Sequence, residues 1–181
     1  MFTRSYCDEG IVLARRSWGE ADRILSLYTK NHGRVSAIAK SVRKPESKKR
    51  GHLEIFGHIR FQIANSKGIG ILTEVETLNS FGSVRKDLKK VTLAYFFMEV
   101  IGKITHEGET HRELFELTLA YLHRLENEKR LKPLRLEFIL RLLTILGFWP
   151  KGRALLNPDA KLEEVIERNL FSPRVGKRIL A

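Results

Sequence analysis

The residues best suited to bind an anion are gathered in one short segment, 40–50, which we call the basic loop. It reads KSVRKPESKKR and contains six cations and one acid. Residues 34–50 have a net charge of +6, which equals the net charge of the whole segment 1–82. The excess positive charge of the N-terminal half therefore lies in and just before one loop, an arrangement typical of proteins that grip a phosphate backbone. The six cations are Lys40, Arg43, Lys44, Lys48, Lys49 and Arg50.

The basic loop also has a plainer interpretation, as a solvated surface or as a lysine-rich loop that keeps a sheet edge from aggregating. An edge needs only one or two lysines for that purpose, whereas this run is nearly single-signed. We therefore predict contact with nucleic-acid phosphates, extended by outward-facing cations on the flanking strands. The contact should be independent of base sequence, because nothing resembles a recognition helix or a base-reading finger. The predicted contact residues are Arg34, Lys40, Arg43, Lys44, Lys48, Lys49, Arg50 and Arg60.

Two further properties of such an interface follow from its chemistry. With about six phosphate contacts, affinity should fall with salt with a log–log slope of about −4 to −5. Base stacking would need an exposed aromatic ring near the loop. The candidates are Tyr28, Phe56 and Trp18, although each also suits the core.

Four acids near the N-terminus suggest a different chemistry, a two-metal nuclease site. Their spacing places them at strand ends or in a turn, where capping and turn contacts are the commoner role. The six histidines form no H-x-x-x-H or H-E-x-x-H pair, and a single cysteine argues against a thiolate zinc site. We expect no catalytic constellation, no metal and no cofactor. The four acids are Asp8, Glu9, Glu20 and Asp22.

The overall composition also favours a polyanionic partner. The chain has 181 residues and a formal net charge of +12, with a pI near 10.0, which points to nucleic acid or an anionic membrane surface. Membrane anchoring is the weaker choice, because the longest apolar stretch, 138–149, is too short to span a bilayer. The N-terminus lacks the hydrophobic core of a signal peptide. We expect a cytoplasmic protein with no membrane partner.

The elements that must position these residues begin with strands. Two-residue periodicity over the first 80 residues predicts strands at 10–18, 22–30, 34–40, 56–64 and 69–75. In the first strand, Arg15 is expected on the same face as Ile11 and Leu13. The residues expected to face inward in the third and fourth strands are Val35, Ala37, Ala39, Ile59, Phe61 and Ile63; His58, Arg60 and Gln62 are expected to face outward. Five short strands suit an OB-type barrel, which we assign as a DNA-binding domain over residues 1–80.

Helical periodicity follows and predicts an all-α domain over residues 83–181. Ser83 is expected to cap its first helix, 83–105, and Thr110 to open a capping box for the second, 110–129. A third helix has Pro133 in its first turn and ends at Gly147, and a fourth runs from 157 to about 170. The expected buried stripes are Val84, Leu88, Val91, Tyr95 and Met98 in the first helix, and Leu114, Leu117, Tyr121 and Leu125 in the second. The fold class is therefore α+β, an N-terminal five-stranded OB-fold β-barrel followed by a helical domain.

The helical domain offers a second candidate surface. A groove between its helices, with Arg135, Arg141 and Arg153 on the rims, could take an acidic–hydrophobic peptide. Ordinary solvent-facing positions explain the same arginines equally well. The segment 172–180 is a second, smaller basic cluster that either joins the basic loop or solubilises the terminus.

Several motifs carry a resemblance to a known family. EGIVL at 9–13, GEADRIL at 19–25, and Thr29 followed by HGRV at 32–35 occur in this order, with Ala39-Lys40 next. With the basic loop, LEIF at 53–56 and the strand 69–76, they resemble the N-terminal barrel of the bacterial RecO recombination-mediator family. LFEL at 114–117, RLL at 141–143 and LGF at 146–148 fit the family's helical part more loosely.

The resemblance implies a function that composition alone does not give. RecO proteins bind single- and double-stranded DNA, anneal complementary strands and, with RecR, help to load RecA onto DNA coated by single-strand-binding protein. The acidic, Phe-ending tail of that protein docks on the family's helical domain. By motif, the resemblance assigns DNA binding to Arg34 and to the six cations of the basic loop, in a nucleoid-associated cytoplasmic protein.

The chain departs from the family pattern after the LGF motif. Many members carry four zinc-binding cysteines there, whereas this sequence continues with Pro150-Lys151-Gly152 and has no cysteine. The resemblance therefore implies a short form without zinc. Two alternatives remain open at this point: an RNA-binding or ribosome-associated OB-fold protein, and a metal-dependent nuclease that uses Glu9, Glu20 and Asp22.

Overall fold

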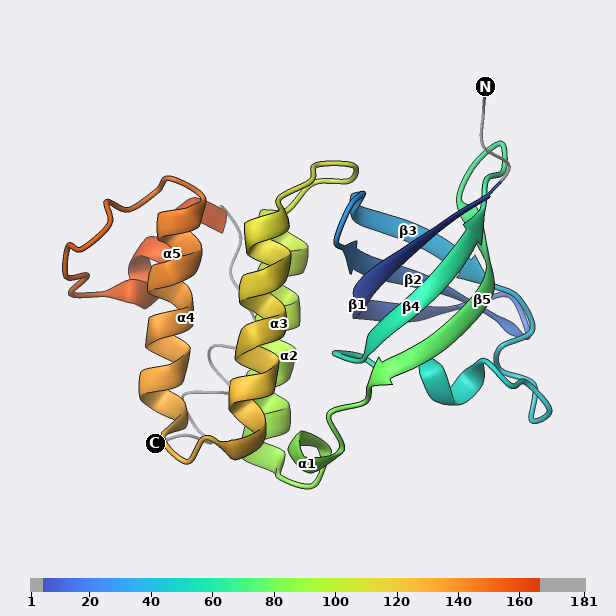
Figure 1. Ribbon diagram of the computed structural model, residues 1–181, viewed down its shortest axis with the longest axis horizontal. Coiled ribbons are helices and arrows are strands. Elements are labelled where there is room, and N and C mark those ends of the chain that lie inside the picture. The colour runs from blue at the N-terminus through green and yellow to red at the C-terminus, as the bar shows by residue number, and fades with distance from the viewer. Residues whose placement is uncertain (1–4, 167–181) are drawn as a thin grey trace. The chain divides into compact units, whose positions relative to one another are not determined.

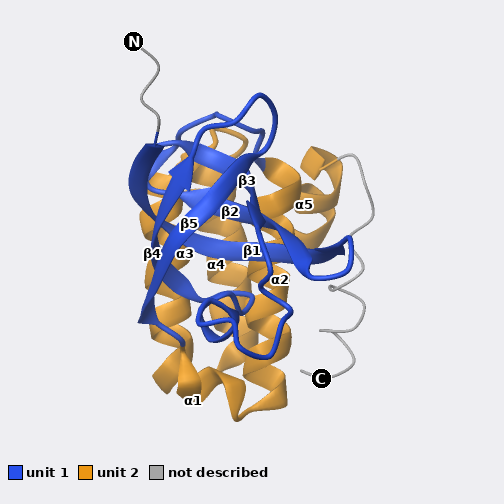
Figure 2. Cartoon of the chain, turned by 90° about the vertical axis from the view of Figure 1, so that its right-hand side faces the viewer, with its two compact units in different colours: residues 1–80, 105–112 blue, residues 81–104, 113–181 orange. Residues whose placement is uncertain are grey.

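The computed structural model of the protein describes residues 5–166, which divide into two compact units (Figures 1 and 2). Unit 1 contains the described residues up to Ser80 together with Thr105–Arg112. Unit 2 contains Phe81–Ile104 and the described residues from Glu113 onward. The chain thus passes between the units near the expected boundary at 80–83, and a short later segment returns to unit 1.

Unit 1 is a closed five-stranded barrel, which confirms the predicted α+β class with a β-barrel first (Figure 1). Its strands are β1 (Ser5–Trp18), β2 (Asp22–Thr29), β3 (Gly33–Ala39), β4 (His58–Ala64) and β5 (Gly70–Asn79). The order around the barrel is β1-β2-β3-β5-β4. The 14-residue β1 closes it, because its first half pairs with β4 and its second half with β2.

The barrel interior follows the predicted alternation. Ala37 and Ala39 of β3 are fully buried, and so are Ile59, Phe61 and Ile63 of β4 to within 2% exposure. Because strand side chains alternate between faces, these residues share one core with the inward residues of β2. Two predicted orientations need comment: Arg60 is exposed as expected, whereas His58 is buried.

A β-bulge changes the expected pattern in β1. Val12 pairs with Leu27 and Arg15 pairs with Leu25, with a register shift between Val12 and Ala14. One extra residue in a strand reverses the faces of all residues after it. The prediction that Arg15 shares a face with Ile11 and Leu13 is therefore wrong: Arg15 shares the inward face with Val12.

The described part of unit 2 is helical. Its elements are α1 (Gly82–Arg85), α2 (Leu88–Ile104), α3 (Arg112–Asn127), α4 (Leu131–Ile145) and α5 (Pro158–Ile166). Phe97, Tyr121 and Phe138, one from each of the three longest helices, pack with ring centroids 4.2–6.1 Å apart and form the centre of its core. Residues beyond 166, including the basic segment 172–180 and the end of the fourth predicted helix, lie outside the described residues.

The first predicted helix is interrupted. Asp87 separates α1 from α2, and its Oδ1 accepts hydrogen bonds from the backbone N–H groups of Lys89 and Lys90. Asp87 is therefore the cap of α2, in place of the predicted Ser83. Leu88 (72% exposed) and Tyr95 (43%) lie at the surface, so the predicted stripe is wrong at these positions.

The later helices match the predictions more closely. Leu114, Leu117, Tyr121 and Leu125 of α3 are all buried as predicted. The predicted capping box is wrong, because the hydroxyl of Thr110 donates to the carbonyl oxygen of Asn31 and α3 begins at Arg112. Gly147 follows the end of α4 with φ +77°, the left-handed conformation expected of a helix-terminating glycine.

The segment Thr105–Arg112 packs on the barrel within unit 1. The N–H of Gly108 donates to the carbonyl oxygen of Arg34 at 3.0 Å, and the hydroxyl of Ser36 donates to Oε1 of Glu107 at 2.6 Å. Gly33 has φ +67°, and a Cβ there would lie 2.2 Å from the carbonyl oxygen of Glu109. The start of β3 is therefore covered by this segment.

Candidate nucleic-acid interface

The basic loop belongs to a folded connection between β3 and β4, residues 40–57. Val42, Leu53 and Phe56 are fully buried, and Val42 and Leu53 belong to the barrel core. A single 3-10 turn, η1 (Arg50–His52), lies between these anchors. Burial of each large apolar side chain stabilises by roughly 1.5–3 kcal/mol, so the connection has its own support from the core.

Backbone hydrogen bonds tie both ends of this connection to the barrel. The N–H of Arg43 donates to the carbonyl oxygen of Ala21 at 2.9 Å. The N–H of Phe56 donates to the carbonyl oxygen of Val12 at 2.8 Å. Oδ1 of Asp22 accepts from the N–H of Ser41 at 2.7 Å. The loop is thus held at the end of the barrel where β1 ends and β2 begins, which we call the loop end.

The cations of the basic loop project outward from this support. Those that are exposed are Lys40, Arg43, Lys44, Lys48 and Arg50. Lys49 is half-buried, and its Nζ donates to the carbonyl oxygen of Leu72 at 3.0 Å. Nη1 of Arg43 reaches the carbonyl oxygen of Gly19 at 3.4 Å. The structure therefore brings six of the eight predicted contact residues together.

The other two predicted contact residues lie elsewhere on the barrel. Arg34 is near the start of β3 and Lys40 just past its end, about 20 Å along a strand that rises ~3.3 Å per residue. Arg60 lies on the outer face of β4 between two carboxylates, 3.4 Å from Glu9 and 3.4 Å from Glu76. Neither Arg34 nor Arg60 directly extends the group of cations in the basic loop.

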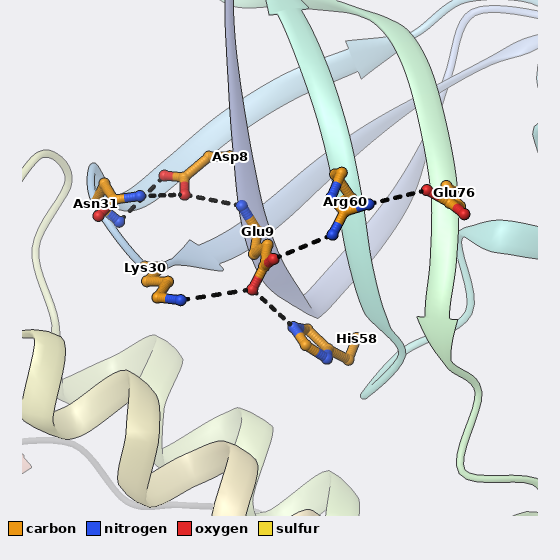
Figure 3. A network of polar contacts seen from close by, with 7 residues as sticks. All are labelled: Asp8, Glu9, Lys30, Asn31, His58, Arg60 and Glu76. Carbon is orange, nitrogen blue, oxygen red and sulfur yellow. Dashed lines mark hydrogen bonds and ion pairs between the residues drawn. The ribbon is translucent and has the colours of Figure 1, made fainter.

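The acids considered for a nuclease site have turn and network contacts (Figure 3). Asp8 is buried and accepts hydrogen bonds from the backbone and the side-chain amide of Asn31, and from the N–H of Glu9. The carboxylate of Glu9 lies among Lys30, His58 and Arg60. Asp8 thus has the turn role that the sequence offered as the alternative to metal binding, whereas Glu9 lies within β1 and forms ion pairs.

The two remaining acids do not join this group. Glu20 is exposed in the turn between β1 and β2, and Asp22 bonds to the loop backbone. Within residues 5–166, no three histidine, cysteine, aspartate or glutamate side chains are placed to hold a metal ion.

One of the three stacking candidates is accessible. Tyr28 and Phe56 are fully buried, so their prediction as stacking rings is wrong. The hydroxyl of Tyr28 donates to the carbonyl oxygen of His111, and burial raises its pKa above the ordinary value. Trp18, at the end of β1, is 51% exposed, with the guanidinium of Arg16 5.7 Å from its ring centre.

Sequence reasoning missed two arginines at the loop end, Arg15 and Arg23. Nη1 of Arg15 donates to Oε1 of Glu54 at 2.5 Å, and Arg23 lies beside it on the neighbouring strand. Arg15 faces inward only because of the β-bulge, and neither arginine had a local signal in the sequence that marked it as part of a site.

Unit 2 contains a groove of about 630 Å³ lined by both apolar and cationic side chains. Its lining includes Leu117, Leu140, Ile145, Arg141, Lys151 and Arg153. Arg135, predicted on the rim, is buried instead: it pairs with Asp159 and lies over the ring of Phe96 at 4.3 Å. Two of the three predicted rim arginines therefore line the groove.

No helix within residues 5–166 is long and apolar enough to cross a lipid bilayer.

Comparison with known proteins assigns both units to one family. The family model described as "Recombination protein O N terminal" matches residues 1–81, and "Recombination protein O C terminal" matches residues 85–176. A protein of Dehalococcoides mccartyi named DNA repair protein RecO is 34% identical over 166 residues, 92% of this chain. Proteins of the same name from Pelotomaculum thermopropionicum and Symbiobacterium thermophilum are 34% identical over 145 residues (80% of this chain) and 30% identical over 175 (94%).

The match covers less of the relatives than of this chain. It spans 65% of the Dehalococcoides protein, 56% of the Pelotomaculum protein and 68% of the Symbiobacterium protein. Since the C-terminal model alone matches more than half of the sequence and the N-terminal model matches the barrel, the chain belongs to the RecO family.

Proposed function

We propose that the protein binds DNA through the basic loop and anneals complementary strands without an enzymatic step. The observation that carries the proposal is the set of exposed cations held on a connection with buried anchors. Cations on a supported loop lose less conformational freedom on binding than those of an unfolded tail, so more of the attraction remains as affinity. Arg34 and Arg60 would add long-range attraction only.

Annealing follows from charge neutralisation. Two DNA strands repel each other through their phosphates, and a protein that displaces counterions from both lowers that repulsion. The loop has cations but no helix or finger that would enter a groove to read bases. Binding would therefore be independent of sequence, and Trp18 supplies a ring for stacking on an unpaired base.

Membership of the RecO family supports a role for this activity in recombinational repair. We propose that the protein acts in the cytoplasm at the nucleoid, with RecR, to help load RecA onto DNA coated by single-strand-binding protein. The acidic, Phe-ending tail of that protein would occupy the groove of unit 2. Leu117, Leu140 and Ile145 would contact the ring, while Lys151 and Arg153 would face the carboxylates.

Strand annealing with reversed charges tests the loop. The variant Lys44→Glu, Lys48→Glu, Arg50→Glu changes three exposed cations and leaves the bonded Lys49 in place. We expect annealing to slow at least tenfold and the salt slope for single-stranded DNA to fall by about 2, since each phosphate contributes about 0.7.

A control variant makes an equal change of net charge in unit 2. The variant Lys86→Glu, Lys89→Glu, Lys132→Glu reverses three exposed lysines there and should anneal at nearly the wild-type rate. Equal loss in both variants would reduce the effect to net charge and contradict the loop assignment. A strong preference for RNA over single-stranded DNA of equal length, in direct competition, would favour the RNA-binding alternative.

The groove is tested separately with a labelled acidic peptide that ends in phenylalanine. Arg153→Glu, which changes an exposed lining residue, should weaken binding at least fivefold in fluorescence anisotropy. Lys132→Glu, outside the lining, should not. Equal binding by a peptide without its terminal phenylalanine would contradict the proposed role of the apolar lining.

A further inference from the structure

Arg23 has an unmet hydrogen-bonding requirement. Its Nη1 is buried and has no hydrogen-bond partner among the described residues. A buried donor without an acceptor costs about 1–3 kcal/mol, and more when the group is charged. Such a group in a folded protein calls for a specific explanation.

The β-bulge brings a second guanidinium to the same place. Ser17 pairs with Arg23, and Arg15 pairs with Leu25. Ser17 and Arg15 are two residues apart on β1 and so face the same way, which makes Arg15 and Arg23 diagonal neighbours on the inward face. Without the bulge, Arg15 would face outward.

The basic loop adds two more guanidinium groups, those of Arg43 and Arg50. Burial lowers the pKa of Arg23, and the charges of Arg15, Arg43 and Arg50 lower it further, against the opposing effect of Glu54. Glu54 is already engaged, because its Oε1 accepts the hydrogen bond of Arg15. The charges of three arginines and of Glu54 therefore all act on Arg23 at the loop end of the barrel.

An oxyanion would meet both the hydrogen-bonding and the charge requirement. Guanidinium groups bind phosphate oxygens in pairs of parallel hydrogen bonds, and these charge-assisted bonds are roughly twice as strong as neutral ones. Arg43 and Arg50 are exposed, and binding of a phosphate at Arg23 would require their side chains to turn aside. Among the charges that act on Arg23, three are basic and one, that of Glu54, is acidic.

We propose that Arg23, with Arg15, Arg43 and Arg50, forms a binding site for a single backbone phosphate of the nucleic acid. This site rests on the proposed DNA-binding function and adds one position at which the bound strand is held. The exposed lysines of the loop attract any phosphate nearby, whereas this arginine site holds one phosphate in a defined place. The bound strand would therefore pass over the loop end of the barrel in a defined register.

Inorganic phosphate probes the site without DNA. At matched ionic strength, phosphate in place of chloride should raise the Tm of the full chain by at least about 2 °C, because a ligand that binds only the folded state stabilises it. Arg23→Gln should abolish this rise, while Arg130→Gln, which changes an exposed arginine of unit 2, should keep it. Without phosphate, Arg23→Gln should melt no lower than the wild type, since it removes a buried donor that has no acceptor.

Single-stranded oligonucleotide binding tests the same variants on the proposed ligand. Arg23→Gln should weaken binding at least tenfold while lowering the salt slope by only about 0.7, the contribution of one phosphate. Arg23→Lys keeps the charge but lacks the planar fork, so it should recover only part of the affinity. A phosphate-dependent Tm rise without an effect on oligonucleotide affinity would assign the site to free phosphate and overturn the proposal.

The outcomes separate this inference from the function on which it rests. If loop reversal weakens DNA binding and Arg23→Gln does not, the arginine site is wrong and the loop assignment stands. If neither variant weakens binding, both are wrong. If Arg23→Gln lowers the Tm in the absence of phosphate and leaves affinity unchanged, Arg23 is a structural residue.

Discussion

Two regions of the barrel contain strand arginines, and they differ in where the acids lie. On the outer face, Arg60 of β4 is flanked by Glu9 and Glu76, so its charge is balanced within the protein (Figure 3). At the loop end, Arg23 of β2 has arginine neighbours, and the nearby Glu54 is already paired with Arg15. If the protein binds DNA as proposed, the distribution of acids, more than the number of arginines, would decide which face is available to the polyanion.

The largest effect is expected where the core supports the loop. Leu53→Ala removes a fully buried anchor beneath the basic loop and should lower the free energy of unfolding by about 2–5 kcal/mol. It should also weaken DNA binding, because the cations lose their fixed positions. Chemical denaturation and oligonucleotide titration measure the two effects.

Leu27→Ala is the matched control for the anchor, since Leu27 is equally buried on β2. It should cost similar stability but leave affinity unchanged at a temperature where both variants are folded. If both variants bind DNA like the wild type, the core support of the loop does not affect binding. The contrast between the two regions would then depend on their charges alone.

A smaller effect on stability, and none on binding, is expected at the turn between β2 and β3, far along the strands from the loop end. Asp8→Ala removes the acceptor for two hydrogen bonds from Asn31 and should cost about 1–3 kcal/mol, the penalty of leaving donors unsatisfied. Affinity for DNA should not change once the variant is folded. Thermal unfolding and anisotropy together check this, and a loss of affinity equal to that of a loop variant would place DNA at the turn between β2 and β3.

Single cations give a finer comparison. Lys44→Ala removes one exposed loop charge and should weaken binding to single-stranded DNA about fivefold at 0.1 M salt, with a slope lower by about 0.7. Arg60→Ala should change affinity by less than about twofold, because its charge is already balanced by two carboxylates. A salt titration of both variants measures the difference. A larger loss of affinity in Arg60→Ala than in Lys44→Ala would assign DNA binding to the outer face instead of the basic loop.

Much of this architecture could be predicted from periodicity. Alternation alone placed Ala37, Phe61 and Ile63 in the core, because a half-buried strand repeats every two residues. The bulge in β1 could not be predicted, since one inserted residue reverses every later side chain without a distinctive sequence signal. Asp87 likewise interrupts a stretch whose helical period continues on both sides.

The candidate site divides in the same way. The basic loop was evident from composition, because it depends only on charges that are adjacent in the sequence. The arginine site was not, because it depends on Arg15 facing inward after the bulge and on Arg23 being deprived of an acceptor by the fold. Properties that arise from three-dimensional proximity of distant residues leave no local pattern to read.

The smallest expected effect concerns Glu54, the acid whose charge acts on Arg23. Glu54→Gln keeps the shape and a hydrogen-bond acceptor for Arg15 but removes a carboxylate that offsets the charge around Arg23. We expect affinity for inorganic phosphate and for single-stranded DNA to rise by about twofold to fivefold, in line with the weak energies of partly exposed ion pairs. Isothermal titration at low salt measures both. A fall in affinity would mean that Glu54 positions Arg15 for the anion and does not compete with the anion for Arg15. The contrast between the two regions would then depend on geometry instead of charge balance.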